Sequence, residues 1–154
     1  MTNVYGAPGS KVEQEHTEYE YVGFWMRLVA SIVDNIWLGV VIFLAALVLM
    51  LVGVVDAKED FSLSSLMVQV LLPFVLVVAL WVRYAATPGK MIFKAKILDA
   101  DTFEPVPTSR LVLRYVGYFV SVLTLFIGFI WVGIDSRKQG FHDKIAGTVV
   151  VKPK

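Results

Sequence analysis

The sequence "RLVASIVDNIWLGVVIFLAALVLMLVGVV", residues 27 to 55, decides the fold. From Asn35 to Val55 it has no ionisable side chain, and that part alone provides the ~20 apolar residues that a helix needs to cross a bilayer. The run nevertheless opens with Arg27 and Asp34, which are close to two helical turns apart and project from the same side. A charge in hydrocarbon costs from about 2.5 kcal/mol upward. Both side chains are therefore expected to meet protein, water or headgroups.

The composition of the whole chain also indicates a membrane protein. Of the 154 residues, 57% are hydrophobic and 18% are charged, against roughly 45–50% and 25% in average globular domains. The net charge of +1 comes without a basic patch interleaved with aromatics, so we expect no nucleic-acid partner. The chain has no cysteine and two histidines. Because it also lacks the common catalytic and nucleotide-binding motifs, we predict no enzyme activity, no cofactor and no metal site.

Three hydrophobic segments are long enough to be membrane spans, at about residues 24–52, 66–84 and 111–134. Pro73 lies inside the second and is expected to be a tolerated kink. The third is less regular, because Arg114 lies near its start and two glycines lie near its end. The fold class that follows is an all-α membrane protein with two long transmembrane helices and a third hydrophobic segment.

The rest of the chain divides into a tail and short segments outside the membrane. Residues 1–20 are polar and acidic, so we predict a disordered tail before a membrane domain at 21–154. Residues 92–98 and 147–152 read as short strands. Because exposed strand edges cannot lie in hydrocarbon, we expect a small cytoplasmic β element of two or three strands at the membrane surface.

The distribution of Lys and Arg predicts the orientation. The loop after the first span has one lysine beside three acidic residues, whereas the loop after the second has three lysines and an arginine. We therefore place the second loop and the N-terminus in the cytoplasm. The C-terminal tail is also basic, and a single third span would carry it outside. Two alternatives remain: a plain third span, or a re-entrant helical hairpin that turns near residues 124–128. In the hairpin, one helix face would carry a polar stripe of Arg110, Arg114, Tyr118 and Ser121.

Arg27 and Asp34 have two interpretations. In the first, both side chains extend to the headgroups. In the second, they belong to an internal cluster completed by His142 and Asp143, which lie in "GFHDKIAGT", residues 140 to 148. That cluster predicts that Arg27 pairs with Asp34, Asp143 or both, so that the tail packs against the first helix. Alternatively, Asp143 only caps a short helix or turn.

Three stretches together resemble the RDD family of small bacterial membrane proteins, which is named for one Arg and two Asp. They are "YVGFWMRLVASIVDN", "TPGKMIFKAKILDADTFEPVP" and "GFIWVGIDSRKQGFHDKIAGTVVV", and the resemblance covers nearly everything from residue 21 to residue 151. Arg27, Asp34 and Asp143 match the three named positions, and the turn after the second helix is matched by Gly89 and Lys90. The resemblance implies a multi-pass protein of the bacterial plasma (inner) membrane.

The resemblance implies a transport activity, and the residues also allow a structural role. A role in monovalent cation/proton exchange has been suggested for the family, and Asp34 would then bind a proton and a cation in turn. Since two or three spans provide few walls for a pathway, exchange would require a homo-oligomer, and no inverted repeat is visible in the sequence. The alternative is an accessory or scaffold protein in the lipid bilayer, in which the Arg and two Asp form a structural salt-bridge network.

Overall fold

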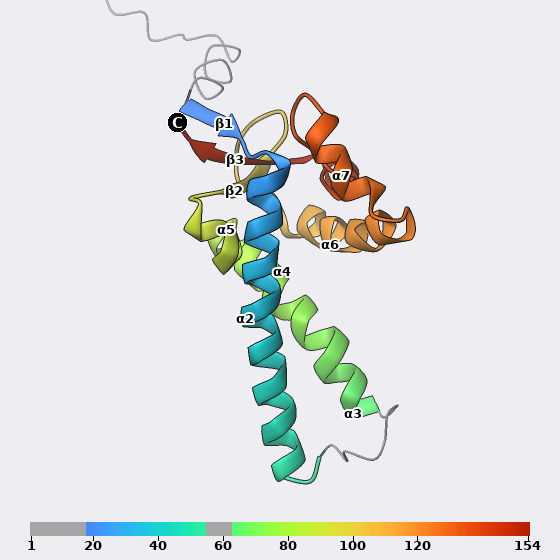
Figure 1. Cartoon of the computed structure of the whole chain (residues 1–154). Coiled ribbons are helices and arrows are strands. Elements are labelled where there is room, and N and C mark those ends of the chain that lie inside the picture. Colours follow the sequence, from blue (N-terminus) through green and yellow to red (C-terminus); the bar gives the residue numbers. More distant parts are fainter. Residues whose placement is uncertain (1–17, 55–62) are drawn as a thin grey trace, which may run out of the picture.

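The computed structural model describes residues 18–54 and 63–154, and it places a small sheet at one end of a long helical stem (Figure 1). The first helix leads away from the sheet, and the second hydrophobic segment leads back toward it. These segments coincide with the first two predicted spans, and both are long and apolar enough to cross a membrane. Their elements are α2 (Phe24–Leu51), α3 (Leu63–Leu66), the π-helix η1 (Met67–Leu71) and α4 (Leu72–Tyr84).

Helix α2 carries its polar side chains near its sheet end and lipid-facing side chains beyond them. Ser31 donates to the carbonyl of Arg27, and Asn35 donates to the carbonyl of Ser31, so these groups are bonded within the helix. Farther along, Phe43 and Leu51 are exposed apolar side chains. An apolar surface of this kind is stable in hydrocarbon, where the helix satisfies its own backbone groups.

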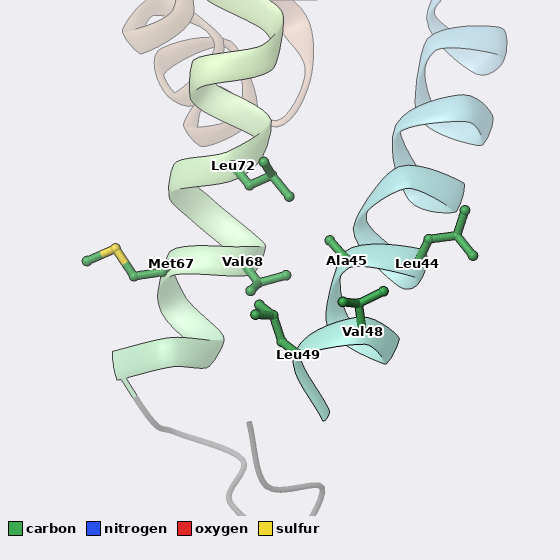
Figure 2. Close-up of a pocket in the computed structure, with 7 residues that line it drawn as sticks. All are labelled: Leu44, Ala45, Val48, Leu49, Met67, Val68 and Leu72. Carbon is green, nitrogen blue, oxygen red and sulfur yellow. The ribbon is translucent and has the colours of Figure 1, made fainter. Parts of the chain in front are cut away.

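The expected kink at Pro73 takes the form of the π-helical turn η1. Proline has no N–H, so the carbonyl four residues earlier, at Gln69, loses its usual α-helical donor. The backbone widens just before this point, and the N–H of Leu72 bonds to the carbonyl of Met67. Figure 2 shows the apolar pocket of about 500 Å³ between η1 and α2, in which Val68 and Leu49 point toward one another.

The sheet has three antiparallel strands in the order β1-β3-β2, so the last strand of the chain lies in the centre. Val151 of β3 lies opposite Tyr21 on one side and Lys96 on the other. Val149 and Val150 are fully buried, and as neighbours on a strand they belong to two apolar clusters on opposite faces of the sheet. The strands are β1 (Tyr19–Tyr21), β2 (Lys96–Asp99) and β3 (Thr148–Pro153).

The sheet differs from the expectation at two places. The strand expected at 92–98 begins only at Lys96, because α5 (Pro88–Ile92) takes up the first residue and a turn follows, in which Lys94 has a left-handed φ of 53°. Strand β1 lies at the end of the segment predicted as a disordered tail, since pairing with β3 orders it. The remainder of that predicted tail, residues 1–17, lies outside the described residues.

The third hydrophobic segment forms two helices, α6 (Thr108–Leu123) and α7 (Ile127–Ile134), which are bent by 101° at a short break. Leu125 and Phe126 adopt left-handed backbone angles there, with φ of 52° and 65°. The segment starts after β2 and leads through α8 (Phe141–Ala146) into β3, so it returns to the sheet end from which it began. Figure 1 shows α6 lying beside α2 and crosswise to it, and α7 turning back toward the sheet. A helix pair bent in this way is either a re-entrant hairpin or a broken third span, so both alternatives stay predictions.

Candidate functional site

The centre of the candidate site is the carboxylate of Asp143, in the first turn of α8, which is completely buried. Arg27 Nη1 donates to its Oδ2 at 2.5 Å, and Arg114 Nη1 donates to its Oδ1. The Thr148 hydroxyl donates to Oδ1 at 3.3 Å, and the Gly140 N–H donates to Oδ2 at 3.0 Å. Asp143 therefore both caps α8 and joins it to α2, α6 and β3.

The electrostatics of Asp143 follow from these contacts. Burial opposes its negative charge, but the guanidinium groups of Arg114 and Arg27 outweigh burial and hold the pKa of the Asp143 carboxyl well below its usual value. Arg27 is fixed further by a bond from Nε to the carbonyl of Val22, at 2.9 Å. The carboxylate is thus ionised throughout the physiological pH range.

Arg114 is the residue of this cluster that the sequence analysis placed only in a polar stripe. It lies on the face of α6 that packs against α8, and its guanidinium lies 5.4 Å from the centre of the Trp81 ring. It also donates to the Thr148 hydroxyl at 2.6 Å. A Cβ added to Gly117, on the same face, would lie 2.8 Å from His142 Cα, so only glycine allows the two helices to approach this closely.

His142 is buried beside the same carboxylate, with its Nε2 atom 3.5 Å from Asp143 Oδ2. Its Nδ1 atom lies 3.4 Å from the Ser121 hydroxyl, and its ring packs against the rings of Tyr118 and Phe129. Burial, opposed by Asp143 and assisted by three nearby cations, lowers the pKa of His142 to about 3. His142 is therefore a neutral member of the cluster at physiological pH.

Asp34 lies in a second polar group, at the junction of α2 and α5. Trp37 Nε1 and the Gly89 N–H donate to its Oδ1 at 3.1 and 2.7 Å. The Thr87 hydroxyl donates to Oδ2 at 2.5 Å, and Lys90 Nζ lies 3.5 Å from the same atom. Of the two partners predicted for Arg27, the structure thus gives Asp143, and the cation beside Asp34 is Lys90.

The predicted turn motif has a clear geometric role. Residues 88–92 form the short helix α5, and the backbone of Gly89 lies directly against α2. A Cβ at this position would collide with the carbonyl group of Ala30 and lie 3.0 Å from the Asp34 carboxyl carbon. A side chain at Gly89 would therefore push α5 away from Asp34.

A cavity of about 680 Å³ connects the two polar groups. At its inner end are Arg27, Asp34, Lys90, Arg114 and His142, and the remaining wall is mainly apolar and comes from α2, α4, α6 and α7. Within the described parts of the chain, no three acidic or histidine side chains gather where they could hold a metal ion. The site is thus a charge-lined hollow without a metal-ligand set among those residues.

Comparison with known proteins agrees with the sequence pattern. The RDD family model matches residues 21–147, a range that includes every charged residue at the inner end of the cavity. The uncharacterized membrane protein YteJ of Bacillus subtilis is 32% identical over 147 residues, which cover 92% of this chain and 87% of that protein. No solved structure matches.

Two further relatives are uncharacterized. YxaI of Bacillus subtilis is 26% identical over 146 residues, which cover 84% of this chain and 95% of that protein. RP437 of Rickettsia prowazekii is 36% identical over 75 residues, which cover 49% of this chain and 41% of that protein. The likeness to RP437 is therefore confined to part of each protein.

Proposed function

Since the chain belongs to the RDD family of membrane proteins, we propose that it is a non-catalytic accessory or scaffold component of the membrane. In this proposal two salt-bridge groups are structural: Asp143 with Arg27 and Arg114, and Asp34 with Lys90. The observation that carries it is that the hydrogen-bonding capacity of the Asp143 carboxylate is already used. Its two oxygens accept hydrogen bonds from Arg27, Arg114, Thr148 and Gly140. A carboxylate with its lone pairs engaged in this way has little capacity left for a transported cation.

Asp34 supports the same proposal. Its four neighbours are donors or cations, and together they tie α5 to α2 beside the sheet. Buried ion pairs add little net stability, but breaking one is costly, so such a network is suited to fixing one arrangement of the elements. The sheet and α8 would then be presented on the membrane helices as one rigid unit.

A second candidate function is monovalent cation/proton exchange in a homo-oligomer. It is favoured by the Asp34–Lys90 pair, because both side chains line the cavity and their charged atoms are 3.5 Å apart. A monovalent cation that bound Asp34 would displace the ammonium group, and Lys90 would release one proton to keep the charge balanced. Neighbouring copies would have to supply the missing walls of the pathway.

Flux measurements on purified protein in proteoliposomes separate the two functions. The accessory role predicts proton movement no faster than in empty vesicles when Na⁺, K⁺ or Li⁺ gradients are imposed. Flux in the wild type that disappears in both Asp34→Asn and Lys90→Gln would instead establish exchange at this pair. Flux that persists in Asp34→Asn would contradict the accessory role and would show that exchange does not depend on this aspartate.

The proposed location is the bacterial inner membrane, with the N-terminus and the sheet in the cytoplasm. Basic side chains gather at the sheet end of the described chain. Two of them form ion pairs with strand residues: Lys152 pairs with Glu20, and Arg110 pairs with Asp99. An excess of Lys and Arg marks the cytoplasmic side of bacterial membrane proteins.

A further inference from the structure

Three buried N–H groups of the cluster lack a hydrogen-bond partner among residues 18–54 and 63–154. They are Arg27 Nη2, Arg114 Nε and Trp81 Nε1. Arg114 and Trp81 are 1% and 2% exposed, and all three residues line the cavity of about 680 Å³. Buried donors are normally paired, and leaving a charged one unpaired is costly. The side chains that carry these donors line the cavity, and a small rotation would turn the donors toward the acceptor oxygens of a ligand there.

The charges of the described cluster do not cancel. Arg27, Lys90 and Arg114 are cations, and they face the two carboxylates of Asp34 and Asp143. One positive charge remains in a largely apolar setting, where an uncompensated charge is strongly disfavoured. A single anionic group in the cavity would neutralise it.

The shape of the cavity indicates the rest of the ligand. Its outer rim includes Leu28, Phe119 and Leu123, which are 39%, 57% and 82% exposed and would face acyl chains in a bilayer. Arg27 is three residues from the start of α2 at Phe24, which is about 4.5 Å along the axis and close to the level of headgroups. A small free anion would fill only the inner end of a cavity this large.

We propose that this cavity binds one anionic phospholipid from the leaflet on the side of the sheet. The phosphate lies beside Arg27, Arg114 and Trp81, and their unpaired N–H groups, which are buried in the free protein, turn toward it on binding. One acyl chain follows the apolar rim toward the bilayer. Both charge and shape are then satisfied by the same molecule, because the anionic group and the chain are joined.

Thermal unfolding and native mass spectrometry of delipidated protein in detergent test the proposal. Phosphatidylglycerol should stay bound and raise the unfolding temperature, whereas phosphatidylcholine with the same acyl chains and inorganic phosphate should not. Equal retention of phosphatidylcholine would overturn the role of the charge. Equal stabilisation by inorganic phosphate would overturn the lipid and leave a free-anion site.

Trp81→Phe removes one of the three donors and keeps an aromatic ring beside Arg114. It should weaken retention of phosphatidylglycerol about tenfold, whereas Trp25→Phe, at an exposed tryptophan that does not line the cavity, should leave it unchanged. Leu28→Trp, which narrows the rim without touching a polar contact, should also weaken retention. Unchanged binding in both Trp81→Phe and Leu28→Trp would place the lipid elsewhere.

Discussion

At the scale of single residues, Asp143 combines complete burial with a full negative charge. Removing an ion from water costs several kcal/mol, and only good geometry with satisfied lone pairs offsets that cost. Here two guanidinium groups, a hydroxyl and a backbone N–H supply the compensation. The aspartate in turn keeps Arg27 and Arg114 from repelling one another across a short distance.

Replacing Asp143 by Asn should lower the free energy of unfolding by about 3–5 kcal/mol, because two buried cations then face no carboxylate. The matched control is Asp101→Asn, which breaks the exposed pair with Arg137 and should cost roughly 0–1 kcal/mol. Adding Arg27→Met to Asp143→Asn should recover part of the loss, as a double-mutant cycle in detergent would show. Equal costs at Asp143 and Asp101 would contradict the buried network.

Stability should fall in mild acid because of His142. Its pKa drops from 6.5 to about 3 on folding. Below pH 6.5, therefore, the imidazole of His142 binds a proton in the unfolded chain but stays neutral in the folded chain. The loss should reach about 2 kcal/mol near pH 5, and His142→Gln should flatten the profile in pH-dependent thermal unfolding. The lowered pKa of Asp143 stabilises the fold above its unfolded value of 3.8 and acts only in stronger acid. An unchanged slope in His142→Gln would assign the acid sensitivity to another group.

At the scale of elements, the bend between α6 and α7 determines the path of the third hydrophobic segment. The two helices are joined through residues in left-handed conformation, and α7 returns to contact α2. The buried face of α6, with Leu111, Arg114 and Ser121, packs inward. The opposite face carries exposed apolar side chains such as Phe119, which are suited to lipid.

The bend predicts that the two ends of the third segment lie on one side of the membrane. Single cysteines at Asp101 and Lys154 should react with an impermeant thiol reagent from the same side, and a cysteine at Val54 should react from the other. The chain has no native cysteine, so each label reports one position. Asp101 and Lys154 labelled from opposite sides in intact cells and inverted vesicles would show that the segment crosses after all.

At the scale of the whole molecule, hydropathy predicted the stem, and local pattern predicted most of the sheet. The spans stand out because lipid demands long apolar helices. The partners of Asp143 could not be predicted with the same certainty, because Arg114 and Arg27 are 29 and 116 residues away in sequence. Arg114 could have been suspected from its place on one helix face with Ser121, but no local signal names its partner.

The remaining differences have the same cause. Strand β1 has three residues, and its pairing with β3 rather than its own sequence makes it a strand. The turn after α4 became the helix α5, since Asp34 of α2 binds the backbone at its start. Both are tertiary effects that act on segments with weak local preference.

The central place of β3 has a consequence for biogenesis. The strand that joins β1 to β2 is the last element of the described chain to leave the ribosome, and Asp143 precedes it by only a few residues. Arg27 emerges 116 residues earlier, which is roughly 6–23 s of translation at 5–20 residues per second. During that interval the nascent helix holds an arginine near the membrane without its carboxylate. Insertion of the stem is thus separated in time from formation of the ion pairs of Asp143. A translational stall before Asp143 would leave a protein whose stem is inserted but whose Arg27 lacks this partner.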